Sequence, residues 1–65
     1  MITVTFLPEA RTETFPKIRT ALQLLEKLQL RVNDALVIRD GELLTPDRCI
    51  EDGDSIVIRM VLSRG

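Results

Sequence analysis

The chain has 65 residues, 45% of them hydrophobic, with a formal net charge of −1 and two Phe as its only aromatic residues. This length allows a single domain over residues 1–65 with an aliphatic core, while the slight acidic balance and the lack of stacking aromatics argue against a direct nucleic-acid ligand. One cysteine and no histidine exclude an internal disulfide, a structural zinc site and a Cys–His nucleophile pair.

The first part of the chain predicts two strands. Residues 1–7 alternate, which places Ile2, Val4 and Phe6 on one side and Thr3, Thr5 and Leu7 on the other. Pro8-Glu9 predicts a turn, and residues 11–15 predict a more polar strand suited to a sheet edge, which Pro16 ends. The opening residues show no basic stretch followed by a long apolar run, so we expect no signal peptide, no membrane span and a cytoplasmic location.

Residues 20–30 show the clearest helical periodicity. Thr20 is a favoured N-cap residue, and Gln23 follows at the spacing of a capping box. The apolar residues that recur at helical spacing are Ala21, Leu24, Leu25 and Leu28. We therefore expect an amphipathic helix over 20–30 whose apolar face packs on a sheet.

The second half of the chain predicts three further strands. Residues 35–39 form a short apolar strand, Asp40-Gly41 is a hairpin turn signal, and residues 42–44 return. After an irregular stretch and a tight turn over 51–54, residues 55–62 form the last strand. The side chains expected on its buried face are Ile56, Ile58, Met60 and Leu62. This succession predicts an α+β fold, with a mixed sheet of four to five strands and one helix packed across one face.

Three segments of the chain resemble the ThiS/MoaD sulfur-carrier family. The family's helix motif T-x-x-E-L-L-x-x-L is similar to TALQLLEKL at residues 20–28, its hairpin V-x-x-N-G-E to VIRDGE at 37–42, and its D-G-D-x-V-x-I to DGDSIVI at 52–58. Counted from Asp54, the chain stops where the chains of that family stop. The resemblance covers essentially the whole length and implies a ubiquitin-like β-grasp fold with a flexible C-terminal tail at about residues 62–65.

The resemblance implies a sulfur carrier and not an enzyme. In that family a partner related to ubiquitin-activating enzymes adenylates the terminal carboxylate with ATP, and a cysteine desulfurase or rhodanese type of sulfur donor converts it to a thiocarboxylate. Carried over to this chain, Gly65 is the adenylated residue, while Leu62, Ser63 and Arg64 thread into the partner, and no cofactor is bound. The acceptor would be a biosynthetic enzyme such as thiazole synthase, in thiamin (thiazole) biosynthesis or in tRNA thiolation, and the free carrier would be a monomer.

Two residues depart from the family's pattern. Arg64 stands where the penultimate glycine of the terminal Gly-Gly is expected, and Gln29 stands where the family often has a glycine near the helix end. A glycine allows the closest backbone approach in a narrow channel because it has no Cβ. Three interpretations of Arg64 stay open. A widened channel or a phosphate accommodates the guanidinium, the chain lacks a final residue, or the protein has lost thiocarboxylation and is a non-conjugating ubiquitin-like interaction module.

The outward side of the last strand predicts a partner-docking face. If the alternate residues of that strand are buried, Val57 and Val61 flank Arg59 in solvent, beside Leu7. Exposed apolar residues next to a reactive tail indicate docking. The alternative is a set of scattered surface apolar residues without a binding role.

Other features have competing interpretations. For Asp52-Gly53-Asp54 we expect a plain turn rather than a metal site, because a calcium loop needs several more spaced oxygen ligands. Cys49 suggests either a persulfide relay or a small apolar filler under the last turn, and we expect the filler. The opening Ile2-Thr3-Val4-Thr5 also resembles β-grasp regulatory domains fused to synthetases and GTPases. No catalytic site is expected, since the sequence offers no nucleophile–base pair and no phosphate loop.

Overall fold

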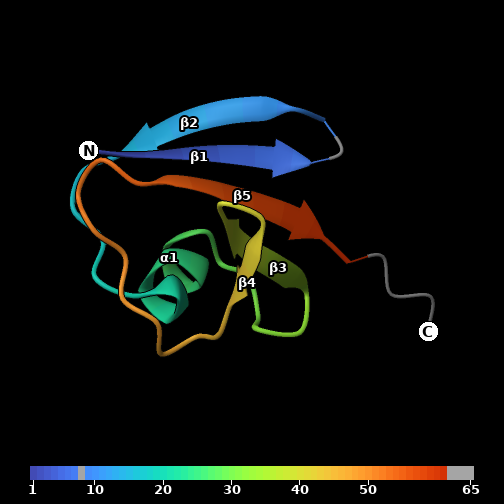
Figure 1. The fold of residues 1–65 in the computed structure, drawn as a ribbon. Coiled ribbons are helices and arrows are strands. Elements are labelled where there is room, and N and C mark those ends of the chain that lie inside the picture. Colours follow the sequence, from blue (N-terminus) through green and yellow to red (C-terminus); the bar gives the residue numbers. More distant parts are fainter. Residues whose placement is uncertain (8, 62–65) are drawn as a thin grey trace.

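The computed structural model describes residues 1–7 and 9–61, which form one five-stranded sheet and one helix (Figure 1). The elements are β1 (Ile2–Leu7), β2 (Arg11–Phe15), α1 (Ala21–Lys27), β3 (Ala35–Arg39), β4 (Glu42–Leu44) and β5 (Ser55–Met60). The strands lie in the order β2-β1-β5-β3-β4, so the last strand lies between the first and the third. β1 and β5 are parallel, whereas the other neighbours are antiparallel, which makes the sheet mixed as predicted.

β2 forms one edge of the sheet and is polar. Its register pairs Phe6 with Arg11 and Ile2 with Phe15, and its first four residues are exposed. The guanidinium carbon of Arg11 lies 4.8 Å from the centre of the Phe6 ring, and its Nε lies 3.3 Å from a carboxylate oxygen of Glu13. Charged side chains of this kind suit an edge strand, because they discourage pairing with another chain.

The β3–β4 hairpin turns at Asp40-Gly41, as predicted. Both residues have positive φ, 53° and 78°, which is the backbone that a two-residue type I′ turn requires. The register therefore pairs Arg39 directly with Glu42 across the turn. This tight turn places the short strand β4 at the other edge of the sheet.

The helix begins as predicted, with a modified capping box. The Thr20 hydroxyl accepts a hydrogen bond from the Gln23 N–H at 3.1 Å, which confirms the N-cap. The Gln23 side-chain oxygen accepts from the N–H of Arg19 at 2.7 Å, one residue before the donor that a capping box uses. The start of the helix is thus held by two hydrogen bonds, one to the Thr20 hydroxyl and one to the Gln23 side chain.

The predicted helix over 20–30 is too long, because α1 ends at Lys27. Gln29 has a φ of 61°, in the left-handed region that usually follows a helix end. The Gln29 N–H donates to the Glu26 carbonyl at 3.0 Å, and the Leu30 N–H donates to the Leu25 carbonyl at 2.9 Å. These two bonds form a Schellman motif, which reverses the chain and returns Leu30 to the core.

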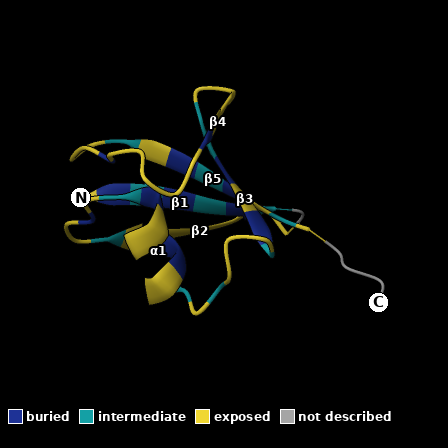
Figure 2. Ribbon diagram, turned by 90° about the horizontal axis from the view of Figure 1, so that it is seen from below, coloured by how far each residue is buried: buried dark blue, intermediate teal, exposed yellow. Residues whose placement is uncertain are grey.

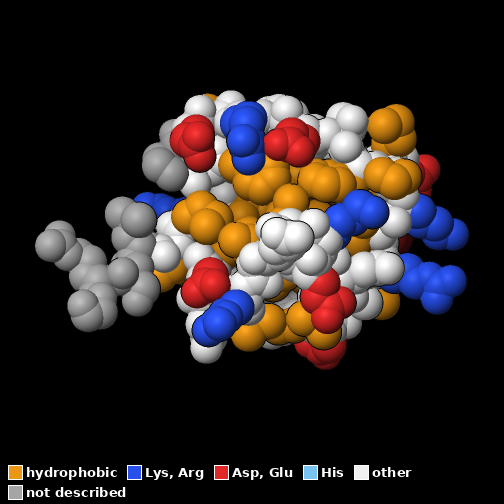
Figure 3. Space-filling model, turned by 180° about the vertical axis from the view of Figure 1, so that it is seen from behind, with side chains coloured by type: hydrophobic (Ala, Val, Ile, Leu, Met, Phe, Trp, Pro, Cys, Tyr) orange, Lys and Arg blue, Asp and Glu red, His pale blue; other side chains and the backbone are white. Residues whose placement is uncertain are grey.

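The core lies between α1 and the inner face of the sheet, where Figure 2 shows the buried residues in dark blue. The alternation predicted for β1 and for residues 56–58 is confirmed, since Ile2, Val4, Ile56 and Ile58 are at most 1% exposed. Phe15, Leu28, Leu30 and Met60 pack against the core but are only partly buried. Figure 3 shows hydrophobic side chains in a band across the back of the molecule.

The last strand ends earlier than predicted. β5 stops at Met60, which pairs with Ala35, the first residue of β3, so the regular ladder ends where its partner strand begins. Leu62, expected at the end of this strand, lies outside the described residues. Val61 still donates its N–H to the Asp34 carbonyl at 2.9 Å.

The architecture is α+β and β-grasp-like, with one helix across one face of a mixed five-stranded sheet in the part of the chain that is described. Two buried residues, Ile18 and Ile50, come from segments without regular structure, where periodicity offers no guide. Over residues 1–7 and 9–61, no helix has the length and apolar character needed to cross a membrane.

Candidate functional site

The structure brings three of the predicted docking residues together on the outward side of the sheet. The parallel register pairs Leu7 of β1 with Arg59 of β5, and Thr5 with Val57. Leu7 and Val57 are half-buried, whereas Arg59 is exposed. Because the core residues Ile56 and Ile58 alternate with them, these side chains point away from the helix.

β3 and β4 extend this apolar surface with residues that the sequence analysis missed. Ile38 lies opposite Val57, and Leu36 lies opposite Arg59. Leu43 of β4 in turn lies opposite Ile38. Leu36 and Leu43 are 39% and 57% exposed. We define the docking face as Leu7, Leu36, Ile38, Leu43, Val57, Arg59 and Val61.

The three added residues were missed because residues 35–38 are apolar at every position. A uniform apolar run does not show which side chains face the core. The missing signal is the strand order: once β3 lies beside β5, its alternate residues must share the outward side with Val57. The face is therefore a property of the assembled sheet rather than of one strand.

Arg59 is the one charged member of the docking face. No ion pair among residues 1–7 and 9–61 uses its guanidinium. A single exposed cation on an apolar surface can select a partner with a carboxylate at the matching place, since charges at interfaces mainly contribute specificity.

Val61 is the last described residue of this face and is 42% exposed. Its N–H donates to the Asp34 carbonyl at 2.9 Å, which ties the chain to the start of β3. The flexible tail predicted at residues 62–65 falls on residues outside the described part of the chain, namely Leu62, Ser63, Arg64 and Gly65. Val61 is thus the anchored residue from which the chain leads into the C-terminal segment.

The turn before β5 is locked by Asp54. One Asp54 carboxylate oxygen accepts from the Glu51 N–H at 2.9 Å and from Arg39 Nη1 at 2.8 Å. Arg39 also donates to the Cys49 carbonyl at 3.1 Å. The Glu51 N–H first, and Arg39 second, lower the pKa of the Asp54 carboxyl from its ordinary 3.8, against the opposing effect of burial.

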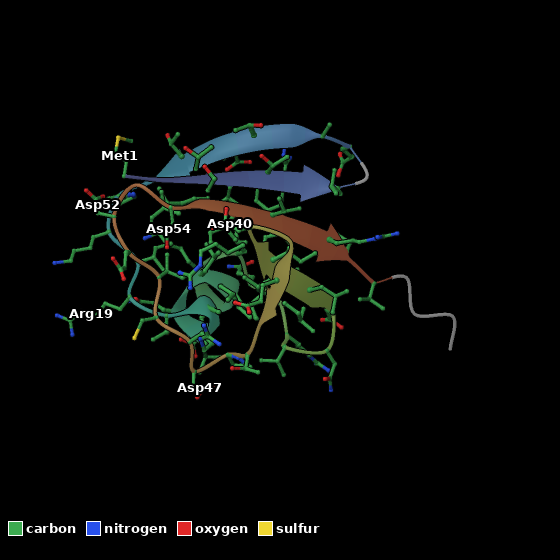
Figure 4. All side chains as sticks on the ribbon, viewed as in Figure 1. Met1, Arg19, Asp40, Asp47, Asp52 and Asp54 are labelled. Atoms are coloured by element: carbon green, nitrogen blue, oxygen red, sulfur yellow. The ribbon has the colours of Figure 1, made fainter. Side chains whose placement is uncertain are left out.

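This turn is also fastened to the N-terminus. The Gly53 N–H donates to the Met1 carbonyl at 2.9 Å, and the Thr3 N–H donates to the Asp54 carbonyl at 3.1 Å. The Met1 amino group pairs with Asp52, and both lie at the same end of the molecule in Figure 4. Gly53 has a φ of 90°, so the expected plain turn is confirmed. In the described part of the chain, no three metal-ligating side chains gather into one group.

Cys49 is exposed, so the expectation that it is a small apolar filler under the last turn is wrong. Residues 48–50 form an antiparallel bridge with Thr20, in which the Ile50 N–H donates to the Arg19 carbonyl at 2.8 Å. Neighbouring residues in such a bridge point to opposite sides. Ile50 therefore takes the buried position, at 5% exposure, and Cys49 faces outward.

No protein-family model matches the chain, and no curated protein matches it. What the structure shows is a small β-grasp-like domain with an apolar surface on the outward side of its sheet. A function for this chain is therefore inferred from its own residues and geometry.

Proposed function

We propose that this protein is a sulfur carrier whose C-terminal Gly65 is adenylated by a partner enzyme and converted to a thiocarboxylate. The observation that carries the proposal is the place of β5, which lies in the middle of the sheet and leads directly to the C-terminal segment. Its outward residues Val57 and Arg59 belong to the docking face. A partner bound there holds the chain close to the base of the segment that ends in Gly65.

The chemistry requires positioning rather than catalytic side chains. A carboxylate is a poor electrophile until one of its oxygens becomes part of a good leaving group. The terminal carboxylate attacks the α-phosphate of ATP and pyrophosphate leaves, which produces an acyl-adenylate. Hydrosulfide then attacks the acyl carbon, a C–S bond forms, and AMP leaves with the electrons of the broken C–O bond. The product is a thiocarboxylate, formed without oxidation or reduction.

The proposed partners follow from this sequence of steps. An adenylating enzyme related to ubiquitin-activating enzymes uses ATP in trans. A cysteine desulfurase or rhodanese carries the sulfur as a persulfide, and a thiol reductant, which is oxidised to a disulfide, releases it as the hydrosulfide used in the acyl transfer. An acceptor such as thiazole synthase takes it up, in thiamin biosynthesis or in tRNA thiolation. We place these reactions in the cytoplasm and expect no bound cofactor.

A non-conjugating interaction module is the second candidate, and Arg64 favours it. A guanidinium replaces the side-chain-free residue that a narrow active-site channel accepts most easily. The docking face serves this candidate equally well, because it lies on the described domain and does not include residues 62–65.

Carrier-dependent exchange of labelled pyrophosphate into ATP separates the two candidates. Adenylation is reversible, so the adenylating enzyme encoded in the same genome should catalyse the exchange only when this protein is added. Deleting Gly65 should abolish the exchange, and Arg64→Gly should keep or increase it. If neither the native chain nor Arg64→Gly supports exchange, the carrier proposal fails and the interaction module remains.

A further inference from the structure

An apolar hollow lies where β5 ends, between the ends of the central strands and the segment that follows α1. Its volume is about 200 Å³. The residues that line it are Phe6, Glu9, Arg11, Leu28, Leu30 and Met60. Phe6 is buried, whereas Leu28, Leu30 and Met60 pack against the core and are only partly buried. None of these residues belongs to the docking face, so this hollow is a separate feature of the domain.

The hollow has the size of one aliphatic side chain. An engineered apolar cavity of about 150 Å³ takes up a benzene molecule, and this hollow is somewhat larger. It opens beside Met60, the last residue of β5. In Figure 1 β1 and β5 end on the same side of the molecule, so the hollow lies where the chain leaves the sheet.

The alternation of β5 continues toward Leu62. Ile56 and Ile58 are at most 1% exposed, and Met60 packs against the same core, whereas Val61 is 42% exposed. The Val61 N–H donates to the Asp34 carbonyl, so the hydrogen bonding between β5 and the start of β3 extends one residue past Met60. In an extended chain the second residue after Met60 falls on the same side, roughly 7 Å further on. Leu62 is therefore the next apolar side chain in line with the hollow.

The charge on the rim also matches the segment that follows. Arg11 is already engaged, because its guanidinium lies over Phe6 and its Nε lies 3.3 Å from a Glu13 carboxylate oxygen. No ion pair among residues 1–7 and 9–61 uses the Glu9 carboxylate. Arg64, two residues after Leu62, is the one cation of the chain beyond Arg59. A leucine followed by an arginine thus presents an apolar group to the hollow and a positive charge to its acidic rim.

We propose that Leu62 of the same chain fills this hollow in the free protein and acts as a latch for the C-terminal segment. Leu62 then adds one side chain to the core, and the free part of the chain begins at Ser63. Three free residues span at most about 10 Å. A partner that draws Gly65 deeper than this into an active site has to withdraw Leu62 first. The contact belongs to the protein alone and does not rest on the sulfur-transfer proposal.

NMR spectra of the isolated, isotope-labelled native chain test the latch. Leu62 methyl groups should show contacts with the side chains of Met60 and of Leu28 or Leu30. The absence of these contacts would overturn the proposal and leave the hollow to a partner molecule. In a mixture of labelled and unlabelled chains, contacts that arise only between different chains would assign the hollow to a second copy and would overturn it as well.

Substitutions at two neighbouring positions test the same contact through stability. Leu62→Ala should lower Tm by roughly 4–8 °C, because the hollow loses its occupant. Leu62→Met should keep most of the native Tm, since methionine has a similar volume and adapts its shape. Val61→Ala is the control, because Val61 is exposed on the opposite side, and its Tm should stay close to the native value.

An exposed Arg64–Glu9 pair adds little stability, so the Tm comparison depends on Leu62. A Leu62→Ala variant as stable as the native chain, or one that loses no more than Val61→Ala, would overturn the latch. Neither measurement uses the adenylating enzyme, so a negative result leaves the sulfur-carrier proposal to its own test.

Discussion

Gln29 is the residue at which the helix stops, and it does so in an unfavourable conformation. Its φ of 61° lies in the left-handed region, which costs a residue with a Cβ roughly 1–2 kcal/mol relative to glycine. The two bonds of the Schellman motif hold it there. A glycine is common at this position in the family that the sequence resembles, and the left-handed backbone supplies a physical reason.

Gln29→Gly should therefore stabilise the domain. We expect a gain of about 0.5–1 kcal/mol in the free energy of unfolding, smaller than the full strain because glycine has more freedom in the unfolded chain. A gain of ~1 kcal/mol raises Tm by roughly 4–8 °C in a domain of this size. Gln29→Ala is the control, since alanine keeps the Cβ and should bring no gain. Equal Tm values for the glycine and alanine variants would contradict this explanation.

Asp54 should make stability depend on acid pH. Its pKa is lower in the folded chain than its ordinary 3.8, so the unfolded state takes up a proton more readily. The stabilisation is complete above the unfolded pKa and is lost as pH falls through the folded pKa. Asp54→Asn, which removes the negative charge that pairs with Arg39, should cost about 1–3 kcal/mol near neutral pH, because hydrogen bonds to charged groups are the stronger ones. In urea unfolding, the difference in unfolding free energy between the native chain and the variant should shrink at about pH 3. A difference that stays constant with pH would rule out this role of Asp54.

At the scale of elements, alternation and turn chemistry predicted most of the fold. The positions of β1 to β4 and the Asp40-Gly41 turn followed from the sequence, because β1 alternates and turn residues bound the other strands. The ends of α1 and β5 were placed too late. A left-handed Gln29 leaves no clear mark in the sequence, and β5 stops at Met60 because Ala35, opposite it, is the first residue of the antiparallel partner β3.

The candidate site was only partly predictable, because several of its residues are brought together only by pairing between distant segments. Val57 and Arg59 could be placed on the outward side from the period of their own strand. Leu36 and Leu43 join them only through the order of strands in the sheet, which no single segment encodes. Cys49 was misplaced because its direction is set by the isolated bridge with Thr20.

Substitutions within and outside the docking face can test whether it binds the partner. Val61→Glu and Val57→Glu should weaken binding to the adenylating enzyme by roughly tenfold or more, since a buried unpaired charge is costly at an interface. Val32→Glu is the control: Val32 has an exposure of 45%, close to the 42% of Val61, but lies outside the docking face. Calorimetric titration gives the affinities, and thermal melting checks the fold. If all three variants bind alike, the face does not dock the partner.

At the scale of the whole molecule, the described fold holds β5 firmly up to its last residues. β5 is held between β1 and β3, and the turn before it is fastened to Met1 and Arg39. The chain then passes Val61, at the edge of the docking face, toward Gly65. The order of elements predicted this architecture, whereas the sulfur chemistry depends on the resemblance and on four residues outside the described part.

Intact-mass spectrometry of the protein after incubation with the adenylating enzyme, ATP and inorganic sulfide tests the central claim most directly. We predict a mass gain that corresponds to the replacement of one oxygen by sulfur, located on Gly65 by fragmentation and absent from a chain that lacks this residue. An unchanged mass for both the native chain and Arg64→Gly, under conditions in which the enzyme modifies a known carrier, would contradict the proposal.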